Sequence, residues 1–288
     1  MAISDASLER LRKMVPADRV LETIEERITY ARDGTQRAES VPDVVVLASS
    51  ADEVEALVRF AHEEKIPITP RGAGTSTTGG AIPVRQGILL DLVAMNRIKE
   101  IDEENLLAVV EPGLITGQFQ AEVEKRGLFY PPDPASKSAC TLGGNAAMCA
   151  GGPRGVKYGV TKDYILGLEA ITPAFGRIRT GVRTVKGVVG YDLTKLLVGS
   201  EGTLGVITEM ILRLIPKPEA TGLMLAAFPG LLAASETVSQ IIAARIIPST
   251  LEFLDKHCIQ AAEHHPVSYT HLRAHETDSY LVCRLLLE

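Results

Sequence analysis

The 288-residue chain has no tryptophan, and aromatic residues make up only 5% of it. Stacking platforms for bases or sugars are therefore scarce. Acidic residues outnumber basic ones and give a net charge of −6, so the chain has no overall basic field that would concentrate nucleic acids. Both shortages argue against DNA or RNA as a partner.

Long apolar runs are also missing. The longest, LMLAAFPGLLAA, is interrupted by Pro229 and Gly230 and falls short of the roughly 18 residues that a spanning helix needs. The first ten residues show no secretory signal, and four cysteines without a CxxC pair indicate reduced thiols. We expect a cytoplasmic protein with no transmembrane segment, which a partner could hold peripherally at the inner membrane.

Glycine, in contrast, is plentiful, and three clusters of it each lie beside an expected strand. The clusters are RGAGTSTTGG at 71–80, TLGGNAAMCAGG at 141–152 and GSEGTLG at 199–205. Glycine lets the main chain approach a ligand closely, so that successive N–H groups can converge on phosphate oxygens. One such loop is more often a plain turn, but three together favour a diphosphate site. Neither GxGxxG after the first strand nor GxxxxGK[ST] occurs, which disfavours a Rossmann or Walker site.

Polar side chains in these loops suit the same kind of ligand. Thr75, Ser76 and Thr141 offer hydroxyl donors. Arg71 can offset phosphate charge or pair with a nearby carboxylate. Asn145 carries both amide donors and an acceptor, which fits the polar edge of a flavin or a base.

The hydrophobic periodicity predicts a mixture of helices and strands. We expect a surface helical lead-in over residues 1–40 and a helix after Ser50, which can form a capping box with Glu53. A short helix capped by Asp192 is also expected. Strands are expected at 67–70, 87–92, 106–110, 165–173, 177–181 and 206–216, and a helix at 118–125.

A pair of prolines, Pro216 and Pro218, suggests a domain boundary. Beyond it the sequence predicts a strand at 222–228 and an amphipathic helix at 231–246, which would open a second domain.

Four motifs in fixed order carry a resemblance to a known family. They are PRGAGTSTTGGA at 70–81, PPDPAS at 131–136, TLGGNAAMCAGG with KYG at 141–159, and TVKGVVGYDLTKLLVGSEGTLGVITEMILRLIPKP at 184–218. Together they resemble the FAD-linked oxidase family, with its vanillyl-alcohol-oxidase or PCMH type of FAD domain, over about residues 41–263. Within the family the likeness is greatest to glycolate oxidase catalytic subunits and FAD-dependent D-lactate dehydrogenases.

This resemblance implies an α+β fold. A two-subdomain PCMH-type FAD-binding domain would span 41–216, and 217–263 would begin an α+β capping domain. Family members continue well past this point, so the resemblance implies a chain truncated at its C-terminal side.

The resemblance also implies which residues bind FAD. They belong to the pyrophosphate loop, the proline loop on the flavin side, the second phosphate and flavin segment, and the turn that closes over the cofactor. The implied contacts are Arg71, Gly72, Ala73, Gly74, Thr75, Ser76, Gly79, Pro132, Asp133, Ser136, Thr141, Gly144, Asn145, Gly151, Glu201, Gly202 and Ile207. Relatives that tether flavin covalently usually carry a His in the first loop or a Cys in the second segment. Because the first loop has no His, we expect FAD to be held non-covalently.

Two cysteines depart from the family pattern. Cys149 stands where relatives often have Asn, and Cys140 lies just before the second loop. Each is either a reactive thiol or a small buried side chain, and the second interpretation is favoured because free cysteine is usually buried.

The segment 264–288 differs from the rest of the chain. His271 and His275 have the i, i+4 spacing of a zinc pair on a helix, with Glu276 beside them. However, the segment resembles translated sequencing-adaptor read-through and matches nothing that we expect in the oxidase family. We therefore interpret it as a non-native tail and predict no metal site.

The intact parent would oxidise a small D-2-hydroxy acid, glycolate or D-lactate, by hydride transfer to FAD. Electrons would then pass to an iron–sulfur subunit or a quinone, or directly to oxygen. The sequence assigns no catalytic residue, and His62 and His257 are interpreted as surface histidines. Two alternatives stay open: another reaction of the same family, as in its ether-lipid synthase or reductase branches, and a non-catalytic FAD-binding fragment.

Overall fold

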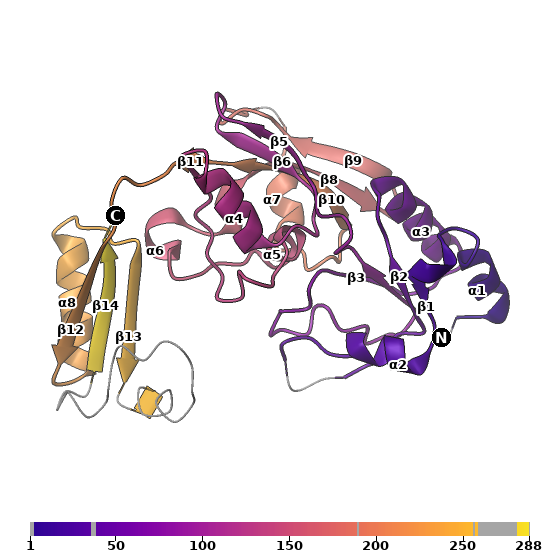
Figure 1. The fold of residues 1–288 in the computed structure, drawn as a ribbon, viewed down its shortest axis with the longest axis horizontal. Helices are drawn as coiled ribbons and strands as arrows, with labels where there is room; N and C mark the ends of the chain where they lie inside the picture. The colour runs from indigo at the N-terminus through magenta and orange to yellow at the C-terminus, as the bar shows by residue number, and fades with distance from the viewer. Residues whose placement is uncertain (1–2, 36–38, 189, 256, 259–280, 288) are drawn as a thin grey trace. The chain divides into compact units, whose positions relative to one another are not determined.

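The computed structural model describes residues 3–35, 39–188, 190–255, 257–258 and 281–287 (Figure 1). It divides into two compact units. The first comprises residues 1–130, 134–150 and 160–217, and the second comprises 131–133, 151–159 and 218–288. Helices and strands are mixed in both units, which confirms the α+β class.

A four-stranded sheet carries the first glycine loop. Its order is β1 (Val20–Leu21), β2 (Val44–Leu47), β4 (Ile88–Asp91) and β3 (Ile68–Arg71). Strands β2 and β3 both run parallel to β4, and β1 is antiparallel to β2. The valines and leucines of β2 and β4 are nearly all buried, as parallel strands usually are.

Helix α3 (Ala51–Glu63) follows β2 and begins where the capping signal predicted. The Ser50 hydroxyl accepts the Glu53 N–H at 3.2 Å. The Glu53 carboxylate accepts the N–H of Ser49 and pairs with Arg19 rather than returning to Ser50, so only half of the capping box forms. The expected stripe at Val54, Leu57, Val58 and Ala61 is buried.

The N-terminal stretch corrects the expected surface helical lead-in. Helix α1 (Asp5–Leu11) ends well before Pro16, and the chain then enters strand β1 after the 3-10 helix η1 (Ala17–Arg19). Helix α2 (Ile24–Arg27) and the 3-10 helix η2 (Ile28–Tyr30) follow. Leu11 and Val15 join the core of the first unit. The lead-in is thus a structural part of the sheet subdomain.

A second, five-stranded antiparallel sheet forms the other half of the first unit. Its order is β5 (Ile98–Asp102), β6 (Leu107–Val110), β10 (Val206–Arg213), β8 (Ile165–Thr172) and β9 (Gly176–Gly181). Helices α5 (Leu142–Met148) and α7 (Leu193–Leu197) pack on β10 and on β8 and β9, and α4 (Thr116–Glu124) packs on β7 (Figure 1). The two sheets correspond to the two expected subdomains. Strand β5 was not predicted, because its charged residues and the bulge between Ile98 and Glu100 obscure the alternation.

The core joins both sheets through α3. Val54 and Leu57 pack in one buried cluster with Val44 and with Ile171 and Val206 of the five-stranded sheet. The shorter elements of this unit are β7 (Leu128–Phe129), which pairs with β11 (Ile215–Pro216), and the 3-10 helix η3 (Thr161–Tyr164). The first unit ends at Lys217, between the two prolines that suggested a boundary.

The second unit contains a three-stranded antiparallel sheet. Its order is β12 (Gly222–Phe228), β14 (Leu281–Leu287) and β13 (Thr250–Asp255), with helix α8 (Leu231–Ala243) against it. A short helix, α6 (Gly155–Tyr158), belongs to the same unit. Over the described ranges, no helix is both long and apolar enough to cross a bilayer.

Candidate cofactor site

The first glycine loop, residues 71–80, leaves the end of strand β3. Gly74 has φ +66°, a conformation that side chains rarely adopt. A Cβ at Gly74 would lie 2.1 Å from Nη2 of Arg71, so the loop rests directly on that guanidinium. Glycine at this position is therefore required by both backbone and packing.

Successive main-chain N–H groups of the first loop are unused. Within the described part of the chain, seven of them donate no hydrogen bond: Gly72, Ala73, Gly74, Thr75, Ser76, Thr77 and Gly80. Further along, the N–H of Thr78 bonds Ser76 Oγ at 3.2 Å, and that of Gly79 bonds Asp33 Oδ2 at 3.0 Å. Neighbouring free amides form the kind of concavity that binds phosphate oxygens.

The second segment uses its amides within the protein. Thr141 caps helix α5 by accepting the Gly144 N–H at 3.2 Å. The N–H of Leu142 bonds the Leu114 carbonyl, and that of Gly143 bonds the Pro112 carbonyl. The first turn of α5 therefore has no free N–H at these positions to offer a phosphate.

The third bend bonds back onto the second segment. The N–H groups of Gly199 and Glu201 donate to the carbonyls of Ala146 and Ala147, both at 2.9 Å. Glu201 has φ +55°, unusual for a residue with a side chain. These bonds hold the third bend against the end of α5.

All three bends meet in the first unit. A Cβ at Gly72 would lie 2.2 Å from Thr141 Oγ1, and one at Gly80 would lie 3.4 Å from both Glu201 Oε2 and Met148 Sδ. The expected neighbourhood of the bends is present. The expectation that all three direct amides at one diphosphate needs correction. The first N–H groups of the second segment bond to oxygens at or before its start, and two N–H groups of the third bend bond to carbonyls of the second segment.

A buried polar cluster lies beneath the first loop. Arg71, which is 9% exposed, donates from Nη1 to the carbonyls of Ala81 at 3.2 Å and Tyr30 at 3.4 Å. Its guanidinium lies 5.6 Å from the centre of the Tyr30 ring. Asp91, its register partner on β4, is 7% exposed. Arg71 thus faces inward, towards these two carbonyls, and among the described residues no carboxylate forms an ion pair with it.

Burial sets the protonation behaviour of this cluster. It lowers the pKa of Arg71, which Asp91 opposes, and it raises the pKa of Asp91. The pKa of Tyr30 is raised to about 12, by burial first and by the Asp91 charge second. Tyr30, Asp33 and Asp91 were missed from the sequence because they lie outside the glycine motifs. The strand pairing of β3 with β4 was the one signal that could have identified Asp91.

Asn145 is buried rather than presented to a ligand. Its Nδ2 donates to Thr116 Oγ1 at 2.7 Å, and the Cys140 thiol lies 3.4 Å from the same oxygen. Cys140 is buried, as favoured, but Cys149 is partly exposed and ends α5 with φ +49°. Ile207 is a buried residue of β10.

Three of the expected contacts belong to the second unit: Pro132, Asp133 and Gly151. There Asp133 lies 3.6 Å from Nε of Arg154. Ser136 belongs to the first unit, where its carbonyl accepts N–H groups of the following turn. The first unit therefore brings together the three glycine bends, which form the diphosphate side of the expected site.

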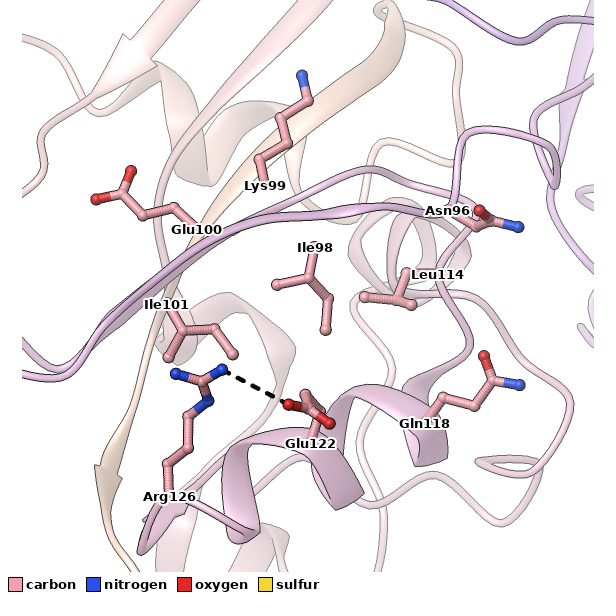
Figure 2. A pocket seen from close by; sticks show the side chains of 9 residues that line it. All are labelled: Asn96, Ile98, Lys99, Glu100, Ile101, Leu114, Gln118, Glu122 and Arg126. Carbon is pink, nitrogen blue, oxygen red and sulfur yellow. Dashed lines mark ion pairs between the residues drawn. The ribbon is translucent and has the colours of Figure 1, made fainter.

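A cavity of about 580 Å³ lies elsewhere in the first unit, between β5 and α4 (Figure 2). It is lined by Asn96, Ile98, Lys99, Glu100, Ile101, Leu114, Gln118, Glu122 and Arg126. Glu122 and Arg126 pair at 3.7 Å on its α4 side. None of its residues belongs to the three bends, so it is separate from the candidate cofactor site.

The two histidines that the structure describes lie outside the three bends. His62 on α3 and His257 are both exposed, as interpreted from the sequence. Over the residues that the structure describes, no group of three or more His, Cys, Asp or Glu could hold a metal ion. His271 and His275 lie outside the described residues.

Two family models match the chain one after the other. An FAD binding domain matches residues 42–181, and the C-terminal domain of FAD linked oxidases matches residues 217–285. The chain therefore belongs to the FAD-linked oxidase family, whose cofactor is FAD. The second match extends into the segment 264–288, and the non-native origin of that segment stays a prediction.

Similar proteins agree with this family. The chain is 50% identical over 230 residues to glycolate oxidase subunit GlcD of Bacillus subtilis, covering 80% of this chain and 49% of that protein. It is 40% identical over 222 residues to D-lactate dehydrogenase of Anaerostipes hadrus, covering 77% and 46%. The chain thus spans about half the length of the curated relatives it matches.

Solved structures share the fold. An alkyldihydroxyacetonephosphate synthase superimposes with a TM-score of 0.86 at 24% identity, covering 99% of this chain and 56% of that one. A p-cresol methylhydroxylase with substrate bound gives a TM-score of 0.82 at 21% identity, covering 99% and 61%. At these identities the likeness concerns the fold alone.

The first loop suits a dinucleotide of this kind. Its N–H groups that lack an acceptor among the described residues match the oxygens of a diphosphate, and glycine at 72 and 74 lets the loop pack against Thr141 and Arg71. The hydroxyls of Thr75 and Ser76 add donors of the same type. The residues present therefore fit the diphosphate of FAD.

Proposed function

We propose that this chain is the FAD-binding part of an enzyme that oxidises a small D-2-hydroxy acid, glycolate or D-lactate, to the 2-oxo acid. The observation that carries the proposal is the 50% identity over 230 residues to a glycolate oxidase subunit. The similarity to a D-lactate dehydrogenase supports the same substrate class.

The reaction removes a hydride from the α-carbon and a proton from the hydroxyl of the substrate. FAD, when bound, supplies the hydride acceptor. A base must take the hydroxyl proton and a cation must hold the carboxylate, and we assign neither role to a described residue. The contribution proposed for this chain is to hold and shield the cofactor.

We assign the residues of the site as follows. The N–H groups of residues 72–76 would hold the diphosphate, with the hydroxyls of Thr75 and Ser76. The second segment and the third bend would form the wall beside them, with Thr141, Gly144, Asn145, Glu201, Gly202 and Ile207 as supporting positions. Pro132, Asp133, Ser136 and Gly151 remain candidates for the flavin side. Because the first loop has no histidine, FAD would be bound without a covalent link.

Electrons would leave the reduced cofactor through a partner. The word subunit in the names of two relatives supports a multi-subunit assembly. An iron–sulfur subunit or a quinone is the acceptor that we propose, and a partner of this type could also hold the protein at a membrane.

The experiment is to purify the 288-residue chain and record its visible absorption spectrum. We expect a bound flavin that is released by acid denaturation, and no turnover of glycolate or D-lactate with an artificial electron acceptor. Turnover, with L-lactate as the stereochemical control, would instead make this chain a complete enzyme. A chain that binds no flavin would contradict the proposal.

A further experiment tests the substrate class. Sequencing the gene past codon 263 and expressing the continued chain should give a flavoprotein that oxidises glycolate or D-lactate. Failure with both acids, in a protein that holds FAD, would reject the substrate while leaving the cofactor site intact.

A further inference from the structure

The first loop lies on a charged residue that bonds main-chain carbonyls of the protein. Arg71 is the last residue of β3, and its side chain bonds the carbonyl of Ala81, just beyond the loop, and that of Tyr30. The guanidinium therefore spans the base of the loop. Gly74 rests on it so closely that no Cβ fits between them.

A buried guanidinium needs a nearby negative charge, because removing an ion from water is costly unless it is paired. The register of β3 with β4 places Asp91 beside Arg71. Residues that face each other in parallel strands point to the same side of a sheet. Asp91 is itself fixed by the N–H of Val93, which donates to Oδ1 at 2.7 Å.

Tyr30 closes the other side of the guanidinium. Its ring faces Arg71, and its carbonyl accepts one of the Arg71 hydrogen bonds. Burial, and after it the nearby Asp91 charge, raises the pKa of its phenol to about 12. Three groups from three separate segments thus converge under one loop.

We propose that Asp91 and Tyr30 are positioning residues that keep the Arg71 guanidinium beneath the first loop, so that the loop presents main-chain N–H groups to the diphosphate. The inference rests on the proposed function, since it assigns how that loop is kept ready for its ligand. Without Asp91, the guanidinium keeps only the weaker influence of the Asp33 carboxylate and moves towards solvent. Gly74 then loses the surface that supports its left-handed conformation.

The test measures the affinity of the full chain for FAD, by quenching of flavin fluorescence, and for ADP, by displacement of FAD. ADP carries the diphosphate without the flavin. We expect Asp91→Asn to weaken both ligands by about the same factor, roughly tenfold, because the change affects the diphosphate contacts common to both. Asp91→Glu, which keeps the charge, should recover part of the affinity.

A matched control separates positioning from a general loss of stability. Glu111 is also a buried carboxylate paired with an arginine, Arg97, but it lies next to the five-stranded sheet. Glu111→Gln should lower the melting temperature while leaving both affinities within about twofold of the starting value. Unchanged affinities in Asp91→Asn, or equal losses in Asp91→Asn and Glu111→Gln, would overturn the inference.

Should Asp91→Asn fail to fold, Tyr30→Phe decides the question. It keeps the ring and the carbonyl and removes only the hydroxyl, and we expect both affinities to fall about threefold. No change in Tyr30→Phe would then overturn the inference. Failure of the proposed function would look different, because the unaltered chain would not bind FAD.

Discussion

The first glycine loop and the pair formed by the second segment and the third bend look alike in sequence but are built differently. In the first, consecutive N–H groups donate to no described residue, and the Arg71 side chain packs against the loop. In the other two, N–H groups bond to neighbouring carbonyls, and the bends fasten one to the other. Glycine therefore permits close packing in both places, and the difference is that six successive N–H groups of the first loop, residues 72–77, have no acceptor among the described residues.

The largest effect is expected at Gly74. Gly74→Ala introduces a methyl group 2.1 Å from the Arg71 guanidinium and a strained φ, so the loop must move. We expect this movement to remove two of the hydrogen bonds from loop N–H groups to the diphosphate. At about 1.5 kcal/mol each, their loss corresponds to roughly a 100-fold weaker affinity for FAD. Titration of flavin fluorescence measures it.

Gly127→Ala is the control for the strain alone. Gly127 also has a positive φ, +71°, but no atom lies within 4 Å of its Cβ position. This variant should lose about 1 kcal/mol of unfolding free energy and keep its affinity for FAD. Equal affinities for FAD in the two variants would remove the distinction between the first loop and an ordinary turn.

A smaller effect is expected where the first loop touches the second segment. In Gly72→Ala, the new methyl group meets Thr141 Oγ1, and we expect affinity for FAD to fall about tenfold as the loop shifts. Removing the hydroxyl as well, in Gly72→Ala with Thr141→Ala, should restore part of it. A double-mutant cycle on FAD affinity measures the coupling, and strict additivity would contradict the contact.

In the third bend, a substitution is expected to increase stability instead of weakening cofactor binding. Glu201→Gly removes a side chain from a left-handed position and should raise the unfolding free energy by less than about 1 kcal/mol. Affinity for FAD should stay within about threefold, since the wall role assigned to this bend uses its main chain. Urea unfolding and flavin titration check both. A loss above tenfold would mean that the Glu201 side chain itself contacts the cofactor.

The smallest effect concerns alkaline pH. Because the folded-state pKa of Tyr30 is raised to about 12 from 10.0, the folded protein favours the neutral phenol. Its contribution to stability is complete below pH 10 and is lost as the pH rises towards 12. Wild-type unfolding free energy should therefore fall more steeply between about pH 10 and 12 than that of Tyr30→Phe. Tyr191→Phe, at an exposed tyrosine, should behave like wild type; equal slopes in all three would contradict the expectation.

Much of the fold could be predicted, because it depends on local patterns. Ser50 and Asp192 mark helix starts through short-range hydrogen bonds, and apolar periodicity identifies the buried stripe of α3. Strand β1 could not be predicted, since two residues have no period and pair only through the tertiary fold. Strand β5 could not be predicted either, because a bulge and surface charges interrupt the alternation of apolar and polar residues that marks a strand.

For the candidate site, too, the sequence predicts some features, while others depend on the tertiary fold. Glycine clusters reveal where the main chain bends, and the family motifs identify the bends as a cofactor region. They do not reveal which N–H groups remain free, because that depends on partners such as Ala146 and Ala147, some 50 residues away along the chain. The inward orientation of Arg71 follows from the pairing of β3 with β4, which the motif does not contain.

The bonds from Gly199 and Glu201 to the end of α5 also bear on the order of events during synthesis. The parallel sheet that supports the first loop is complete in sequence once β4 has been translated. Its facing wall has to wait for more than a hundred further residues, from Asp91 to Glu201. Contacts so distant in sequence form late, because long loops must close first. A ribosome-bound intermediate arrested before residue 199 would thus carry the anion-binding half of the site with its opposite side open.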